Sequence, residues 1–157
     1  MPEIKTIKPF NGLRKYTQWA SLWADPSTVD ILGYVSEVCH PEDCLVFCRL
    51  LLPDFTVAKG GVFLSDKYSE EGVEAWIRHL DGDMRAVERV VNHTHMYDVF
   101  ACCKDDVEDI IYLQLAEIIA VSWRLVLKQK IPDRDFIVNV SNTDQDYGPT
   151  IELFQVG

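Results

Sequence analysis

The segment IIYLQLAEIIAVSWRLVL, residues 110–127, decides the fold that this sequence predicts. It is the most apolar part of the chain, but Glu117 and Arg124 lie inside it. A charged side chain near the middle of a bilayer is costly, and a membrane-spanning helix needs about 20 mostly apolar residues. The segment therefore predicts a buried helix rather than a membrane span, and we expect no membrane association.

The flanks of this segment set the length of the helix. Asp105 and Asp106 precede it, where negative charge favours the positive end of the helix dipole. Lys128 and Lys130 lie in its last turn, and Pro132 beyond them cannot continue a helix. We predict one long helix from Asp105 or Asp106 to about Lys130, covered on most of its sides.

On the C-terminal side of the long helix, two stretches alternate between apolar and other residues. They are DFIVNVS, residues 135–141, and TIELFQV, residues 150–156, and the polar sequence NTDQDYGP separates them. Such alternation is typical of strands with one buried face. We predict a hairpin over about residues 135–156.

On the N-terminal side, the stretch CLVFCRLLLPDFTVAKGGVFLS, residues 44–65, is rich in leucine, β-branched and aromatic residues. Proline and aspartate interrupt it at 53–54, and two glycines interrupt it at 60–61. We predict two strands joined by a turn at residues 53–54.

Helices fill the rest of the chain. Apolar residues at helical spacing predict short helices over about residues 12–39, with Asp25 and Pro26 as the cap and first turn of the second. Ser69 and Asp83 are expected to cap two further helices between residue 69 and the long helix.

This order of elements predicts an α+β fold. Strands paired as hairpins around helices favour a mainly antiparallel sheet, of about four strands here, with the two hairpins joined and packed against the long helix and the shorter helices. The chain has 157 residues and a mass of 18.0 kDa, a size typical of one domain, so we predict a single globular domain over residues 1–157.

Composition and charge exclude several functions. The net charge is -10 and the pI is near 4.7, whereas nucleic-acid affinity rests on many Lys and Arg contacts, so we expect no DNA or RNA binding. The first 20 residues contain no apolar run of the length that a signal peptide needs, which predicts a cytoplasmic protein. The five cysteines make an odd count without secretory context, so we expect reduced thiols, most of them buried.

The stretch VVNHTHMYDVF, residues 90–100, raises the question of a metal site. On a helix, His93 and His95 point about 200° apart around the axis, whereas on an extended segment they face the same way. Asn92 is a plausible helix terminator, but helical spacing continues, and we predict helix here. The residues at this spacing are Val87, Val91, Thr94 and Asp98. The hypothesis is a divalent metal, zinc or another, held by His93, His95 and Asp98 with a distant fourth ligand.

The acidic residues before the long helix suggest a second kind of site. They are Asp105, Asp106, Glu108 and Asp109. Charge compensation at the helix start explains them without any function, but they can also form a negative surface that attracts a basic partner. Trp19 and Trp23 on the first helix are candidate aromatic contacts of such an interface, or else they cover the core.

Catalysis leaves no signature in this sequence. It contains no nucleophile elbow, phosphate-binding loop or dinucleotide-binding glycine motif. We therefore predict a non-enzymatic module that binds a basic protein partner, in the manner of immunity proteins that neutralise nuclease toxins. The alternatives are a metal-binding protein or metal-dependent hydrolase using His93, His95 and Asp98, and a small-molecule binding module with a pocket between the sheet and the N-terminal helices.

Overall fold

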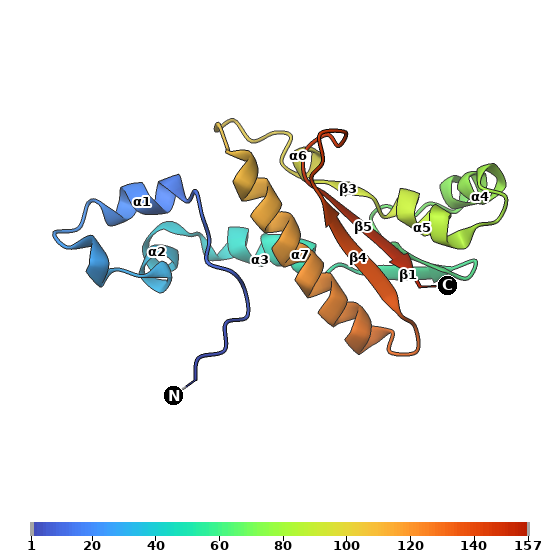
Figure 1. The fold of residues 1–157 in the computed structure, drawn as a ribbon, viewed down its shortest axis with the longest axis horizontal. Coiled ribbons are helices and arrows are strands. Elements are labelled where there is room, and N and C mark those ends of the chain that lie inside the picture. The colour runs from blue at the N-terminus through green and yellow to red at the C-terminus, as the bar shows by residue number, and fades with distance from the viewer. Residues whose placement is uncertain (1, 157) are drawn as a thin grey trace. The chain divides into compact units, whose positions relative to one another are not determined.

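The computed structural model describes residues 2–156, which divide into two compact units at the bond between Leu50 and Leu51 (Figure 1). The first unit is helical. It contains α1 (Arg14–Ala20), the 3₁₀ turn η1 (Pro26–Thr28), α2 (Ile31–Val38) and nearly all of α3 (Pro41–Leu51). The expectation of a single domain over residues 1–157 stays a prediction.

The start of α2 differs from the prediction. The Asp25 side chain does cap a turn, accepting from the Ser27 backbone nitrogen at 3.0 Å, but the capped element is only η1. Asp30 caps α2 instead, with its carboxylate 2.8 Å from the Gly33 backbone nitrogen. An aspartate before a proline is thus a correct cap signal that does not report the length of the helix that follows.

The predicted strand over residues 44–52 is wrong, because these residues belong to α3 and the bend that follows it. Pro41 occupies the first helical position, with Glu42 and Asp43 in the first turn and Arg49 in the last. These are helix signals, and an apolar run of this length cannot be assigned by periodicity alone.

The second unit opens with a hairpin of β1 (Phe55–Ala58) and β2 (Gly61–Leu64). Its turn lies at Lys59 and Gly60, not at residues 53–54, and both turn residues have positive φ, 54° and 87°. A two-residue turn of this conformation matches the twist of the paired strands, and glycine adopts it without strain.

Helices α4 (Glu70–His79) and α5 (Met84–Val91) follow, and the two predicted caps are confirmed. The Ser69 hydroxyl accepts from the Gly72 nitrogen at 3.1 Å, and the Asp83 carboxylate accepts from the Ala86 nitrogen at 3.1 Å. After α5 come the short strand β3 (Thr94–His95) and the single turn α6 (Met96–Val99).

Helix α7 (Asp109–Lys130) is the predicted long helix, but it begins at Asp109 after the N-cap residue Glu108, so the predicted start at Asp105 or Asp106 is wrong. The C-terminal hairpin of β4 (Phe136–Ser141) and β5 (Thr150–Gln155) is confirmed. The α7 helix lies against β4 and β5 (Figure 1) and buries one face, consisting of Ala116, Ile119, Ala120, Trp123 and Leu127. Residues 111–120 contain no exposed side chain, whereas Val121 and Leu125 are 39% and 65% exposed, so the expectation that most sides are covered holds over residues 111–120 and not beyond them.

By length and composition alone, α7 is the one helix in residues 2–156 that could cross a membrane. The core helix of a soluble protein passes the same test, and α7 packs on β4 and β5 as such a helix does.

The α+β class is confirmed, with antiparallel pairing throughout the described strands. The strands form two sheets, however, of order β1-β2 and β3-β5-β4, in place of one sheet of about four strands. The backbone ladders of β2 and β5 do not meet, and side chains at the end of α5 bond to both strands instead.

The cysteines are less buried than predicted. Cys44, Cys102 and Cys103 are exposed and Cys39 is half-buried, so the expectation that most cysteines are buried is wrong.

Candidate functional site

Polar residues at the end of α5 form two groups, one buried and one near solvent. Residues four apart lie on the same side of a helix, so the side chains of Glu88 and Asn92 share one side, and those of Arg89 and His93, which both meet Glu152, share another. The first pair faces the protein interior and both residues have no exposed surface. The second pair faces β5 near solvent.

Glu88 joins the two sheets. Its Oε1 accepts from the Val62 backbone nitrogen on β2 at 2.7 Å, and its Oε2 accepts from the Gln155 backbone nitrogen on β5 at 2.7 Å. The Gln155 side-chain amide also donates to Oε1. A buried carboxylate is tolerated only when hydrogen bonds replace its hydration, and here they come from both strands.

Asn92 repeats this arrangement one turn later. Its Oδ1 accepts from the Leu64 nitrogen at 2.8 Å, and its Nδ2 donates to the carbonyls of Val62 at 2.9 Å and Leu153 at 3.1 Å. The backbone groups on the facing edges of β2 and β5 thereby obtain the hydrogen-bond partners that a neighbouring strand would otherwise supply. We call Glu88 and Asn92 the buried clasp.

The clasp coincides with the end of the helix, and the prediction of continued helix through His93 is wrong. The α5 helix ends at Val91, and Thr94–His95 is extended and pairs with β5. The Lys67 ammonium donates to the His93 carbonyl and to the Thr94 hydroxyl, which holds the segment in place. Helical spacing of apolar residues was outweighed by these tertiary contacts.

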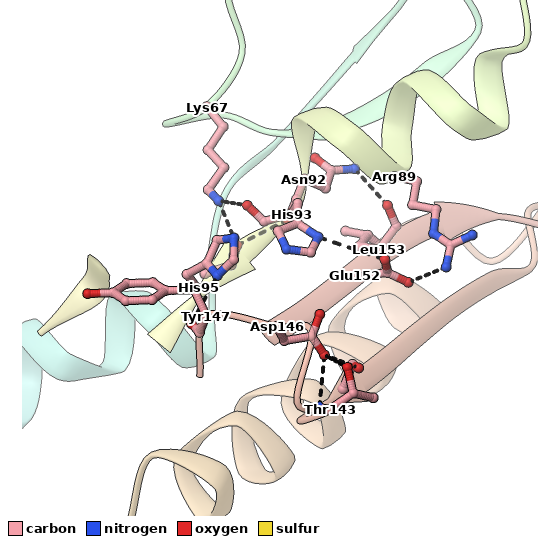
Figure 2. Close-up of polar contacts among 12 residues, drawn as sticks. Lys67, Arg89, Asn92, His93, His95, Thr143, Asp146, Tyr147, Glu152 and Leu153 are labelled. Atoms are coloured by element: carbon pink, nitrogen blue, oxygen red, sulfur yellow. Dashed lines mark hydrogen bonds and ion pairs between the residues drawn. The ribbon is translucent and has the colours of Figure 1, made fainter. Parts of the chain in front are cut away.

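Because the segment is extended, His93 and His95 lie on one side of it. Their ring centroids are 4.6 Å apart at an interplanar angle of 61°. His95 pairs with Thr150 in the ladder, so it shares a sheet face with Thr150 and, two residues along β5, with Glu152. The close-up shows the two imidazoles beside each other (Figure 2).

Glu152 connects the histidines to α5. Its Oε2 lies 2.9 Å from Arg89 Nη2, and its Oε1 lies 3.8 Å from His93 Nδ1 (Figure 2). We call His93, His95, Glu152 and Arg89 the histidine cluster. Burial is the main reason that the pKa of His93 is lowered from 6.5, and the neighbouring His95 and Lys67 lower it further, against the opposing charges of Glu152 and Asp146.

One lysine and one aspartate, Lys67 and Asp146, also act on the charge of His93. Burial lowers the pKa of Lys67, and the carboxylates of Asp66 and Asp98 act in the opposite direction. Asp146, in the loop between β4 and β5, accepts from the hydroxyls of Ser141 and Thr143, at 2.6 and 2.8 Å. These bonds, with one from the Thr143 backbone, lower its pKa to about 2.

A surface rich in tyrosine and carboxylate continues from the cluster. The Tyr147 carbonyl lies 3.3 Å from His95 Nδ1, and the Tyr147 ring lies 5.3 Å from the Tyr97 ring at 89°. Tyr97 also meets Tyr112 at 5.0 Å and donates its hydroxyl to Asp109 on α7. Gly148 allows this packing, since a side chain there would meet the Tyr97 ring within 2.6 Å.

The carboxylates of this surface come from α6, from the segment between α6 and α7, and from the first residue of α7. Residues 98–109 contain five carboxylates and one lysine, and all five carboxylate residues are exposed. We call the following residues the acidic tyrosine surface: Tyr97, Asp98, Asp105, Asp106, Glu108, Asp109, Tyr112 and Tyr147.

The structure brings some of the residues predicted from sequence together. His93 and His95 meet, and Asp109 bonds to Tyr97, but Asp98 is one of the exposed carboxylates beyond the histidines. Within residues 2–156, no group of three or more His, Cys, Asp or Glu side chains is placed to hold a metal ion. The metal hypothesis therefore stays a prediction that rests on the histidine pair.

Trp19 and Trp23 belong to the first unit. The Trp19 ring packs against Tyr34 at 5.3 Å and Trp23 at 5.9 Å, and its Nε1 donates to Glu37 Oε2 at 2.5 Å. Trp19 is therefore part of the small aromatic core of that unit, while Trp23 is 45% exposed. A role for either ring in binding stays a prediction.

Reasoning from sequence missed Glu88, Lys67 and Glu152. It named Asn92 only as a helix terminator, and this residue is indeed the C-cap of α5. One signal was present for Glu88, because it follows Met84 by four residues and so shares the apolar side of α5. A carboxylate on the buried side of an amphipathic helix needs a partner. Lys67 and Glu152 reach the cluster from separate elements and leave no local pattern.

No family model matches this chain, and searches of curated proteins and of solved structures found no similar protein. The functional argument therefore rests on the geometry of the site.

Proposed function

We propose that the protein is a non-enzymatic, cytoplasmic module that binds a basic protein partner through the acidic tyrosine surface. The observation that carries this proposal is the position of Tyr147, which is 67% exposed and packs edge-on against Tyr97, itself bonded to Asp109. An exposed ring held by its neighbours loses little side-chain entropy on binding, which is why tyrosine is common among interface anchors.

Charge supports the same partner class. Five exposed carboxylates lie within residues 98–109, and one of them, Asp109, accepts from the hydroxyl of Tyr97 beside this ring, in a chain of net charge -10. A negative surface attracts a positive one over about 10 Å at physiological salt, and the attraction raises the association rate. A basic partner thus gains an aromatic anchor and complementary charge at one place.

A capture experiment from extract of the cells that make the protein tests the proposal. The bait is compared with an Asp105→Asn, Asp106→Asn, Glu108→Gln variant. The control is Glu71→Gln, Asp133→Asn, Asp135→Asn, which removes the same charge from exposed positions on α4 and before β4.

We expect the wild type and the control to capture one basic protein that the surface variant loses. Repeating the capture at higher salt should weaken it, because exposed charge pairs are screened. Equal capture by the surface variant and the wild type, an acidic partner, or no specific partner at all would contradict the proposal.

A second candidate function is the binding of zinc or another divalent metal by His93 and His95. The observation that favours it is the 4.6 Å contact between the two rings on an extended segment. Elemental analysis of tag-free protein tests it, in comparison with a His93→Ala, His95→Ala variant. About one metal per chain that the variant lacks supports a metal site. No metal in the wild type contradicts it.

A further inference from the structure

The segment before α1 contains an asparagine followed directly by a glycine, Asn11 and Gly12. Residues 2–12 are all exposed, and none of them belongs to a helix or a strand. Gly12 has a φ of 72°, in the left-handed region that glycine enters without strain. The Arg14 backbone nitrogen donates to the Gly12 carbonyl at 2.8 Å, so the start of α1 contacts this dipeptide through that carbonyl. The two residues are therefore open to water and outside any regular backbone structure.

Asparagine is among the chemically labile residues of proteins, and its reactivity depends on the residue that follows it. The backbone nitrogen of that residue attacks the asparagine Cγ, and a five-membered succinimide ring closes as ammonia leaves. A side chain on the following residue crowds this attack and restricts the rotation that brings the two atoms together. Glycine presents neither obstacle, because it has no Cβ.

We propose that Asn11 is a site of spontaneous deamidation, with Gly12 supplying the attacking nitrogen. The bond between the Gly12 nitrogen and the Asn11 Cγ forms, the bond between Cγ and Nδ2 breaks, and ammonia leaves with the Gly12 amide proton. Water then adds to one of the two ring carbonyls, and the bond from that carbon to the ring nitrogen breaks. Hydrolysis at Cγ gives aspartate, and hydrolysis at the backbone carbonyl gives isoaspartate. The net reaction consumes one water and releases one ammonia, without oxidation or reduction.

The other three asparagines of the chain are protected by their surroundings. Asn92 has no exposed surface, and its Nδ2 donates to two strand carbonyls. Asn139 lies within β4, where it is paired with β5 and followed by a β-branched residue. Asn142 is exposed in a loop, but the nitrogen that would attack it belongs to the β-branched Thr143 and already donates to Asp146 at 3.0 Å. Asn142 is therefore the closest internal comparison.

Deamidation changes the first unit in two ways. A new carboxylate adds one negative charge three residues before Arg14, and the isoaspartate form also lengthens the backbone ahead of α1 by one carbon. Both products differ from the starting chain in net charge at neutral pH, so stored protein becomes a mixture of charge forms. This inference is independent of the proposed binding surface, which belongs to the second unit.

The experiment incubates purified full-length protein at mildly alkaline pH in water enriched in heavy oxygen. Cleavage after lysine and arginine then releases the peptide of residues 6–14, because Pro9 blocks cleavage after Lys8. We expect this peptide to gain one heavy oxygen and to separate into aspartate and isoaspartate forms, with isoaspartate more abundant. The other three asparagines should keep their amides. A sample digested before incubation measures any conversion during the digest.

Two variants make the assignment specific. Gly12→Ala should slow the loss of the Asn11 amide on the order of tenfold, because the added side chain crowds the attack. Asn11→Gln should keep its amide, because its longer side chain would have to close a less favoured six-membered ring.

Three results with the wild-type chain would overturn the proposal: an Asn11 amide that is retained, loss at Asn142 as fast as at Asn11, or an aspartate product without isoaspartate. An unchanged rate in Gly12→Ala would do the same. The main readout uses the wild-type chain, so it does not depend on whether a variant folds.

Discussion

The two sides of the α5 end differ in what their polar residues do, although they are adjacent in sequence. The buried clasp of Glu88 and Asn92 has every hydrogen bond satisfied by the backbone of β2 and β5 or by a side chain of β5. The histidine cluster, which includes Arg89 and His93, meets Glu152 with longer and more exposed contacts. Within the six residues 88–93, the side of the helix on which a residue lies therefore decides its role. Residues on one side hold the two sheets together, and residues on the other side form the partly exposed cluster.

The two groups of residues also differ in how much their contacts contribute to the free energy of unfolding. A buried donor left without a partner costs about 1 to 3 kcal/mol, whereas an ion pair at the surface contributes about 0 to 1 kcal/mol. Substitutions on the clasp should therefore affect folding, and substitutions on the cluster should affect charge and titration.

The largest effect is expected from Glu88→Ala. This change removes the acceptor of the Val62 and Gln155 backbone nitrogens and leaves both without a partner. We expect the free energy of unfolding to fall by about 2 to 5 kcal/mol, measured by urea denaturation. Glu88→Gln keeps the shape and one acceptor and should lose less. A loss below about 1 kcal/mol for the alanine variant would mean that the clasp does not join the sheets.

Asn92→Ala should have the next largest effect. It leaves the Leu64 nitrogen and the carbonyls of Val62 and Leu153 without their side-chain partner. We expect a loss of about 1 to 3 kcal/mol in the same assay. Hydrogen exchange should show faster exchange at Leu64 than in the wild type. Unchanged protection of that amide would contradict the assignment of its bond.

Lowering the pH should reduce the stability of the protein through His93. The pKa of His93 is lowered in the folded chain, so the unfolded chain takes up its proton first as the pH falls. The His93 contribution to stability is therefore present above the unfolded value of 6.5 and is lost as the pH falls below it. NMR titration of the His93 ring should give a pKa below 6.5.

Two variants sharpen this titration. Glu152 raises the pKa of His93 and Lys67 lowers it. Glu152→Gln should therefore move the midpoint of His93 further down, and Lys67→Met should move it up. A His93 midpoint above 6.5 in the wild type, or shifts of the opposite sign in both variants, would refute this description of the cluster.

The smallest effect on folding is expected from Arg89→Ala. The Arg89 side chain is 55% exposed, pairs with Glu152 at 2.9 Å and lies 5.4 Å from the Phe154 ring. Loss of the exposed pair should cost less than about 1 kcal/mol by urea denaturation. Arg85→Ala, which removes a guanidinium 4.9 Å from the same ring without touching Glu152, is the matched control. If Arg89→Ala lowered the free energy of unfolding as much as Glu88→Ala, the distinction between the buried clasp and the histidine cluster would be wrong.

Local signals predicted much of the fold. The caps Ser69 and Asp83 depend on contacts within three residues, and the long helix and the two strands of the C-terminal hairpin follow from the apolar pattern along each segment. The strand expected at residues 44–52 failed because an apolar run has no period that distinguishes helix from strand, although Pro41 and the acidic residues after it marked a helix start.

The site was less accessible to prediction than the fold. The sequence pointed to His93 and His95 as a pair, and their rings do meet, but their arrangement depends on Lys67, which is 26 residues away from His93 and bonds to its carbonyl. Glu152 reaches the cluster only because β5 pairs with β3. Contacts of this kind follow from tertiary structure, and no spacing in the sequence reports them.

The dissociation constant of the captured basic partner, measured by calorimetry for the wild type and for Tyr147→Ala, tests the central claim most directly. The control is Trp76→Ala, which removes another partly exposed ring, from α4. The account predicts that Tyr147→Ala weakens binding on the order of tenfold or more while Trp76→Ala leaves it unchanged. Unchanged affinity for Tyr147→Ala would contradict the claim that the acidic tyrosine surface is the binding site.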